Sequence, residues 1–142
     1  MVTVTSSVDL VAVTPQAVWS VVSDSAGMVR RAAHVHSVVM DGDVARWTVS
    51  LNGSRIQWEQ REHAEPPHCL TFEQVTGDLD ELRGTWTVRA LETGVRVRLE
   101  IAFHLGVDGL APLLDPIWAQ SFHFHADALV QGVAYEIGTD QQ

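Results

Sequence analysis

Residues 95–116 read VRVRLEIAFHLGVDGLAPLLDP, and two different periodicities meet in this stretch. In 95–104, apolar side chains alternate with charged or small ones, which predicts a strand with one buried and one wet face. Asp115 and Pro116 then supply an N-cap and a residue suited to the first helical position. We therefore expect a last strand followed by one long helix that runs from Pro116 to Gly138.

The rest of the chain supplies strands and short helices upstream of this stretch. A strand is expected over residues 3–11, a helix begins at Thr14-Pro15, and a second short helix covers 25–31. The period then switches to two, and turn signals such as Asn52-Gly53 separate further strands at 34–40, 44–51, 54–63, 68–75 and 82–90. This order predicts an α+β fold in which seven antiparallel strands curl around the last helix, with a cavity between them.

Composition narrows the class of protein. The 142 residues, 46% of them hydrophobic, are expected to form a single domain over residues 1–142. A net charge of -9 argues against nucleic acids and anionic membrane surfaces as partners. Cys69 is the only cysteine, and the amino terminus lacks the pattern of a signal peptide. We expect a soluble cytoplasmic protein, either a monomer or a homodimer.

Three stretches carry a resemblance to a known superfamily. They are TPQAVW at 14–19, FEQVTGD with LRGTW at 72–86, and FHLGVDGLAPLLDP at 103–116. Together with the element order, they resemble the helix-grip fold of the START/Bet v 1-like superfamily. Bacterial polyketide cyclase/aromatase proteins and related ubiquinone-binding proteins are the nearest likeness. One departure is AGMVRR at 26–31, which stands where many relatives have an aromatic-Pro pair, so the cavity entrance is expected to differ.

The resemblance implies an activity and its partners. Cyclases of this fold bend a poly-β-ketone inside the cavity and assist enolisation, ring closure and loss of water. Such chemistry needs an acid or base with a pKa near neutrality and a donor for the enolate, but no cofactor or metal. The expected ligand is small and apolar or aromatic, and a polyketide synthase carrier protein is a candidate partner.

Either of the two faces of the strand at 54–63 could line the cavity. Alternation puts Glu59, Arg61 and His63 on one face, with Trp58 on the other. The resemblance places His63 near an inward arginine of relatives, which makes Arg61 the candidate polarising donor and His63 a candidate acid or base. The apolar pattern favours the other face, because Trp58 would otherwise meet solvent. In that case Glu59, Arg61 and His63 are cross-strand partners on a solvated face, and both alternatives stay open.

Histidines elsewhere in the chain are further candidates for catalytic residues. His34 lies where aromatases place an inward phenol, so it is a candidate acid or base, with an exposed loop histidine as the alternative. His125 lies on the inward stripe of the last helix and is either a helix-side catalytic partner or a core residue bonded to a carbonyl. His123 and His125 point in different directions on a helix, so they do not predict a metal site.

Aromatic residues are the candidates for ligand contact, because an indole offers large apolar faces and one hydrogen-bond donor. Ordinary core packing is the alternative for each of them, and we prefer it for Trp86. The residues expected to contact a ligand are Trp47, Trp58, Glu59, Gln74, Trp86, Trp118, Phe122 and Leu129.

Two classes of function follow. The first is a polyketide cyclase/aromatase-like enzyme, with Arg61, His63, His34 and His125 as its catalytic residues. The second is a binding or transport protein for an apolar ligand such as a quinone or lipid, and a chaperone-like member of the same fold is a third alternative. Convergence of His34, His63 and His125 would favour the enzyme, since a carrier can be lined almost entirely by apolar residues.

Overall fold

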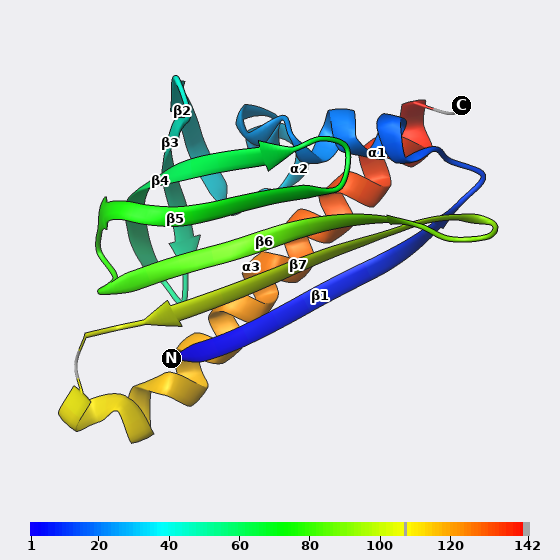
Figure 1. Ribbon diagram of the computed structural model, residues 1–142. Helices are drawn as coiled ribbons and strands as arrows, with labels where there is room; N and C mark the ends of the chain where they lie inside the picture. The colour runs from blue at the N-terminus through cyan, green and yellow to red at the C-terminus, as the bar shows by residue number, and fades with distance from the viewer. Residues whose placement is uncertain (107, 141–142) are drawn as a thin grey trace.

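The computed structural model describes residues 1–106 and 108–140. Within that part of the chain, seven strands form one antiparallel sheet in the order β1-β7-β6-β5-β4-β3-β2 (Figure 1). The strands are β1 (Val2–Val11), β2 (Val35–Asp41), β3 (Val44–Leu51), β4 (Ser54–Glu65), β5 (Cys69–Gly77), β6 (Glu81–Ala90) and β7 (Gly94–His104). The sheet and the long helix packed on it confirm the predicted α+β helix-grip fold.

Short helices follow β1, and the long helix ends the described chain. They are α1 (Pro15–Val22), the 3-10 turn η1 (Ser25–Gly27), α2 (Met28–Arg31), a second 3-10 turn η2 (Asp108–Leu110) and α3 (Ala111–Asp140). Thr14 caps α1 as expected, because its hydroxyl accepts a hydrogen bond from the amide of Ala17.

The predicted start of the long helix was wrong by more than one turn. The helix α3 begins at Ala111, so Pro116 lies inside it rather than at its first position. A proline removes one backbone hydrogen bond, and this close to the helix start the bond lost is among the first that the helix can make. The apolar stripe further along α3 holds the helix against the sheet regardless of where it starts.

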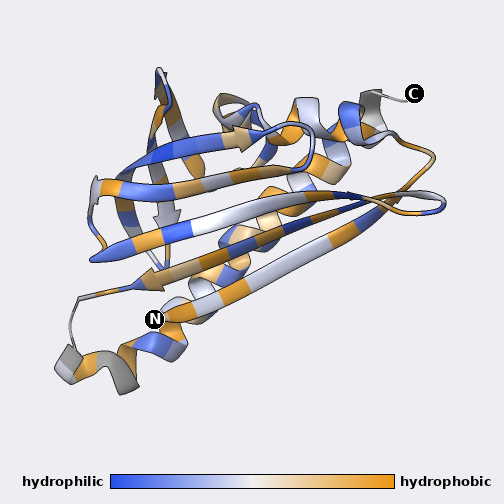
Figure 2. Ribbon diagram, viewed as in Figure 1, coloured by the Kyte–Doolittle hydropathy of each residue, from blue (hydrophilic) through white to orange (hydrophobic). Residues whose placement is uncertain are grey.

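The antiparallel register puts one face of the sheet in the core. The five large apolar residues of β7 are at most 2% exposed, and so are Phe122, Ala126 and Val133 on α3. Figure 2 shows how apolar and polar residues alternate along the strands. The turn Asn52-Gly53 has positive φ at both positions, as a tight hairpin requires. We call the face toward α3 the inner face and the opposite face the outer face.

The helix α3 packs mainly against β1 and also contacts β7, and its C-terminal part contacts α1 and α2 (Figure 1). On β1, the Ser6 hydroxyl donates a hydrogen bond to Asp127 Oδ1 at 2.5 Å, which fixes α3 to the sheet. On β3 and β4, the indoles of Trp47 and Trp58 extend from the inner face to His125 of α3. No helix in the described residues is long and apolar enough to cross a membrane.

Candidate functional site

The structure determines which face of β4 turns inward. Trp58 and Gln60 are each 3% exposed, so the inner face carries Trp58, Gln60 and Glu62. The side chains of Arg61 and His63 are 62% and 73% exposed on the outer face. Of the two alternatives left open for this strand, the structure favours the solvated outer face for Arg61 and His63. The apolar pattern was the better guide, because a buried tryptophan removes far more apolar surface from water than an arginine stem.

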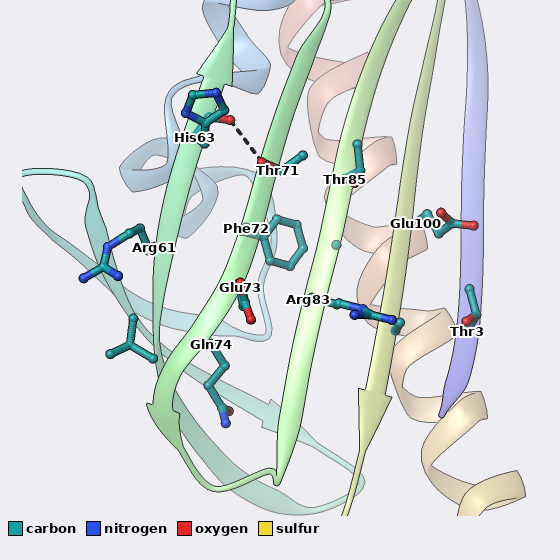
Figure 3. Close-up of a pocket in the computed structure, with 13 residues that line it drawn as sticks. Thr3, Arg61, His63, Thr71, Phe72, Glu73, Gln74, Arg83, Thr85 and Glu100 are labelled. Atoms are coloured by element: carbon teal, nitrogen blue, oxygen red, sulfur yellow. Dashed lines mark hydrogen bonds between the residues drawn. The ribbon is translucent and has the colours of Figure 1, made fainter.

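A groove of about 720 Å³ crosses the outer face, and Arg61 and His63 lie at one side of it (Figure 3). Glu73, Arg83 and Glu100 stand on neighbouring strands across the same groove. Arg61 points away from the middle of the groove in Figure 3 and lies 3.7 Å from Asp43. Glu59, also on this face, accepts a hydrogen bond from Arg46 Nε at 3.0 Å. These residues behave as the cross-strand partners of a solvated face.

Two of the predicted histidines meet on the inner side. His34 directly precedes β2, and its Nε2 lies 2.6 Å from Nδ1 of His125 in the middle of α3. His125 is 3% exposed, whereas His34 is half-buried. His63, the third member of the expected cluster, is on the outer face. The hydrogen bond between the rings needs one shared hydrogen, so one imidazole donates it and the other accepts it.

Aromatic rings surround the buried histidine. Trp47 on β3 stacks on Trp58 with ring centroids 5.6 Å apart and planes at 8°. Each indole meets the His125 ring edge-on at 5.9 Å, and Phe122 does so at 6.1 Å. We call Trp47, Trp58, Phe122, His125 and His34 the aromatic–histidine cluster. It combines large flat apolar faces with two titratable rings.

A line of polar side chains supports this cluster. Trp58 Nε1 donates to Gln60 Oε1, and Gln60 Nε2 donates to Glu62 Oε2, both at 2.8 Å. Ser25, in η1, donates from its hydroxyl to both oxygens of Glu62 at 2.9 and 2.8 Å. The sequence places Gln60 and Glu62 on the same strand face as Trp58, but it did not lead us to propose them, or Ser25, as site residues. The signal that could have found them is the spacing of Gln60 and Glu62 two and four residues after Trp58, which puts all three on one face.

Burial sets the protonation states inside the site. Burial, aided by the charge of His34, lowers the pKa of His125 to about 3. Burial also lowers the pKa of His34, with a smaller contribution from His36. Both rings are therefore neutral near pH 7. Burial raises the pKa of Glu62, and the hydrogen bonds from Gln60 and Ser25 offset part of that effect.

The other predicted contact residues are spread over the inner side. Trp86 is 4% and Leu129 3% exposed, both in the core. Trp118 is half-buried near the start of α3, with its ring 6.3 Å from Phe122. Gln74 donates from Nε2 to the Leu79 carbonyl at 2.9 Å, while its buried Oε1 has no hydrogen-bond partner among the described residues. Trp47, Trp58 and Phe122 are thus the predicted contacts that lie directly beside the histidine pair.

Metal ligands do not gather in the described residues: no three His, Cys, Asp or Glu side chains are arranged to hold an ion there. His123 and His125 diverge on α3, since His123 is exposed and lies 3.5 Å from Asp127.

The sequence was compared with models of known protein families. Residues 11–123 match the family described as polyketide cyclase / dehydrase and lipid transport. The chain belongs to this family. A search of curated proteins gave no match.

Solved structures of several proteins share the fold at low sequence identity. Thermus thermophilus TTHA0849 superimposes with a TM-score of 0.88 at 20% identity, covering 99% of this chain and 100% of that one. The Zhui aromatase/cyclase from a Streptomyces species gives 0.75 at 17% identity, covering 99% and 96%. A START superfamily protein from Mycobacterium smegmatis gives 0.68 at 17% identity, covering 94% and 97%. At these identities the likeness concerns the fold alone.

For a member of the polyketide cyclase / dehydrase and lipid transport family, the cluster offers two kinds of interaction. The indole pair and Phe122 can pack against a flat apolar ligand. The neutral imidazoles of His34 and His125 can accept or donate a proton, and His34 is the one that also borders solvent. Gln60 and Glu62 are hydrogen-bonded to each other, to Trp58 and to Ser25, so they support the wall formed by Trp58.

Proposed function

We propose that the protein binds a flat polyketide-type or aromatic intermediate at the aromatic–histidine cluster and catalyses its ring closure and dehydration by acid–base chemistry. The observation that carries this proposal is the 2.6 Å contact between His34 Nε2 and His125 Nδ1 inside an aromatic wall. An apolar surrounding alone would serve a carrier equally well. A buried pair of imidazoles beside half-exposed His34 adds groups that can move protons.

His34 is the residue proposed to exchange protons with the ligand. In the tautomer where its Nε2–H donates to His125 Nδ1, the Nδ1 atom of His34 is a free base. That atom would take a proton from the carbon between two carbonyls, and the resulting enolate carbon would attack a ketone carbon of the same chain. The protonated His34 then returns that proton to the new alkoxide, which becomes a hydroxyl. In the dehydration, His34 takes a proton from the adjacent ring carbon and passes it to the hydroxyl, so that the C–O bond breaks, water leaves and a ring double bond forms.

His125 is proposed as a positioning residue. Its Nδ1 fixes the orientation of the His34 ring, while Trp47, Trp58 and Phe122 hold its own ring in place. The low pKa of His125 keeps it neutral, so it does not compete with His34 for a proton at pH 7. A polyketide synthase carrier protein, as the source of the linear intermediate, remains part of the proposal.

The test is product analysis with a reconstituted minimal polyketide synthase that releases a linear poly-β-ketone. We expect the wild type to direct the chain to one cyclised, dehydrated product. His34→Ala should reduce that product by about 10²- to 10⁴-fold, the range for loss of a general acid–base group. The matched control is His63→Ala, which removes an exposed outer-face histidine and should leave the product unchanged. Equal product with and without the protein would contradict the proposal.

Carriage of an apolar ligand is the second candidate. It is favoured by the internal pairing of Ser25, Gln60 and Glu62, which leaves the described inner face mainly aromatic and aliphatic. Saturable binding of quinones or fatty acids together with no effect on polyketide products would favour this candidate.

A further inference from the structure

The indole N–H of Trp47 is a buried donor without a partner. Trp47 is 4% exposed, and its Nε1 atom has no hydrogen-bond partner among the described residues. Its neighbour in the stack, Trp58, has the opposite condition, because its N–H donates to Gln60 at 2.8 Å. Buried donors are nearly always paired in folded proteins, so one that is not paired calls for an explanation such as a ligand or a water.

The surroundings of Trp47 do not supply an acceptor. One face of the Trp47 indole is covered by the Trp58 ring, and the planes of the two rings differ by 8°. His125 lies edge-on at 5.9 Å and uses its Nδ1 for His34. Its strand neighbour on the inner side, Ala45, is fully buried and brings only a methyl group. The free donor therefore lies among apolar surfaces, where an acceptor would be held without competition from water.

We propose that Trp47 determines specificity by donating its N–H to an oxygen of the bound ligand. The inference rests on the proposed function and narrows its ligand class: conjugated ring compounds that carry a carbonyl or similar acceptor, rather than hydrocarbon rings or plain acyl chains. An indole N–H lies in the plane of its ring, so the acceptor approaches at the edge of Trp47 and not over its face. A ligand without an oxygen there leaves the donor unpaired.

A pair of rigid probes tests this donor. Fluorene and 9-fluorenone share one flat skeleton and differ by a methylene in place of a carbonyl. Calorimetric titration of the wild type at pH 7 should show about tenfold tighter binding of 9-fluorenone, which is the effect of one hydrogen bond. In Trp47→Phe the ring remains and the donor is lost, so the two probes should bind with equal affinity.

The matched control is Trp58→Phe. This variant removes the neighbouring indole, whose N–H is already bonded to Gln60. It should therefore lower the affinity for both probes by the same factor and keep the preference for 9-fluorenone. A second measurement does not depend on a variant that folds. In the wild type, the ¹⁵N–¹H indole signal of Trp47 should shift downfield with 9-fluorenone and not with fluorene.

Each outcome has one meaning. Equal affinity of the wild type for the two probes, or a preference that survives in Trp47→Phe, would overturn the role of Trp47 and leave the ligand site intact. Binding of neither probe would overturn the ligand site itself, and the inference would fall with it. A carbonyl preference lost only in Trp47→Phe would support it.

Discussion

His34 Nε2 lies 2.6 Å from His125 Nδ1, and this contact joins the start of β2 to the middle of α3 across the interior of the fold. The two residues are 91 positions apart in sequence. Because His125 is fully enclosed by Trp47, Trp58 and Phe122, its protonation is coupled to the packing of the helix on the sheet. The properties of this pair can be measured separately from any activity.

Stability should fall on acidification because of His125. The pKa of His125 is lowered from 6.5 to about 3, so between these values the unfolded chain binds more protons than the folded one. The free energy of unfolding should therefore drop by up to about 1.4 kcal/mol per pH unit as pH falls below 6.5. Urea unfolding of wild type and His125→Gln at pH 7 and pH 5 measures this effect.

We expect the wild type to lose about 2 kcal/mol more than His125→Gln between those two pH values. His63→Gln, at an exposed histidine, serves as the control and should keep the wild-type pH dependence. Identical pH dependence in wild type and His125→Gln would mean that His125 is not held neutral by burial.

The ion pair between Arg31 and Glu136 should be important for stability. Arg31 Nε lies 2.7 Å from Glu136 Oε2, and the Arg31 side chain is 3% exposed. Glu136→Ala leaves the buried guanidinium with the carbonyls of Val21 and Asp24 and, at 3.3 Å, the Asp24 carboxylate. Because it removes the carboxylate nearest to a buried charge, it should cost about 3 kcal/mol. Urea denaturation provides the measurement.

Arg30 provides an internal control for that prediction. It bonds the same Glu136 at 2.8 Å, but its side chain is 63% exposed. Arg30→Ala should therefore change the free energy of unfolding by less than about 1 kcal/mol. Similar losses of unfolding free energy for Arg30→Ala and Arg31→Ala would show that burial is not the reason why the Arg31–Glu136 pair contributes to stability.

The sequence predicted the fold well because local signals agreed along the chain. Alternation in 95–104 and the Asn52-Gly53 turn each correspond to one element of the structure. The helix start was misplaced because Pro116 reads as a first-turn residue, while α3 begins more than one turn earlier, at Ala111. Local patterns thus locate elements better than their ends.

The site was predictable only in part. His125 was found from its place on the inward stripe of α3, and His34 from a resemblance. Their contact depends on how α3 crosses the sheet, which no local pattern gives. For Arg61 and His63 the sequence left two alternatives open, because a charged strand face and a catalytic one have the same alternation. The signal that separated them was the apolar Trp58 on the opposite face.

Gln60 should contribute to stability because it accepts the hydrogen bond of the buried Trp58 indole. Gln60→Leu leaves Trp58 Nε1 buried without an acceptor and leaves Glu62 Oε2 with Ser25 as its remaining donor, which should reduce stability by about 1–3 kcal/mol. Gln57→Leu on the exposed face of the same strand is the control, and a change within about 0.5 kcal/mol is expected. Chemical denaturation of both variants is the measurement, and equal effects would contradict a supporting role for the Ser25–Glu62–Gln60 line.

The central claim is that ligands bind at the aromatic–histidine cluster and not in the outer groove. The direct measurement is a titration of the wild type with 1,8-dihydroxyanthraquinone, followed by NMR of the assigned histidine rings. We predict saturable shifts of His34 and His125 with His63 unchanged. Shifts of His63, with His34 and His125 unaffected, would contradict the account and place the ligand in the outer groove beside Arg61.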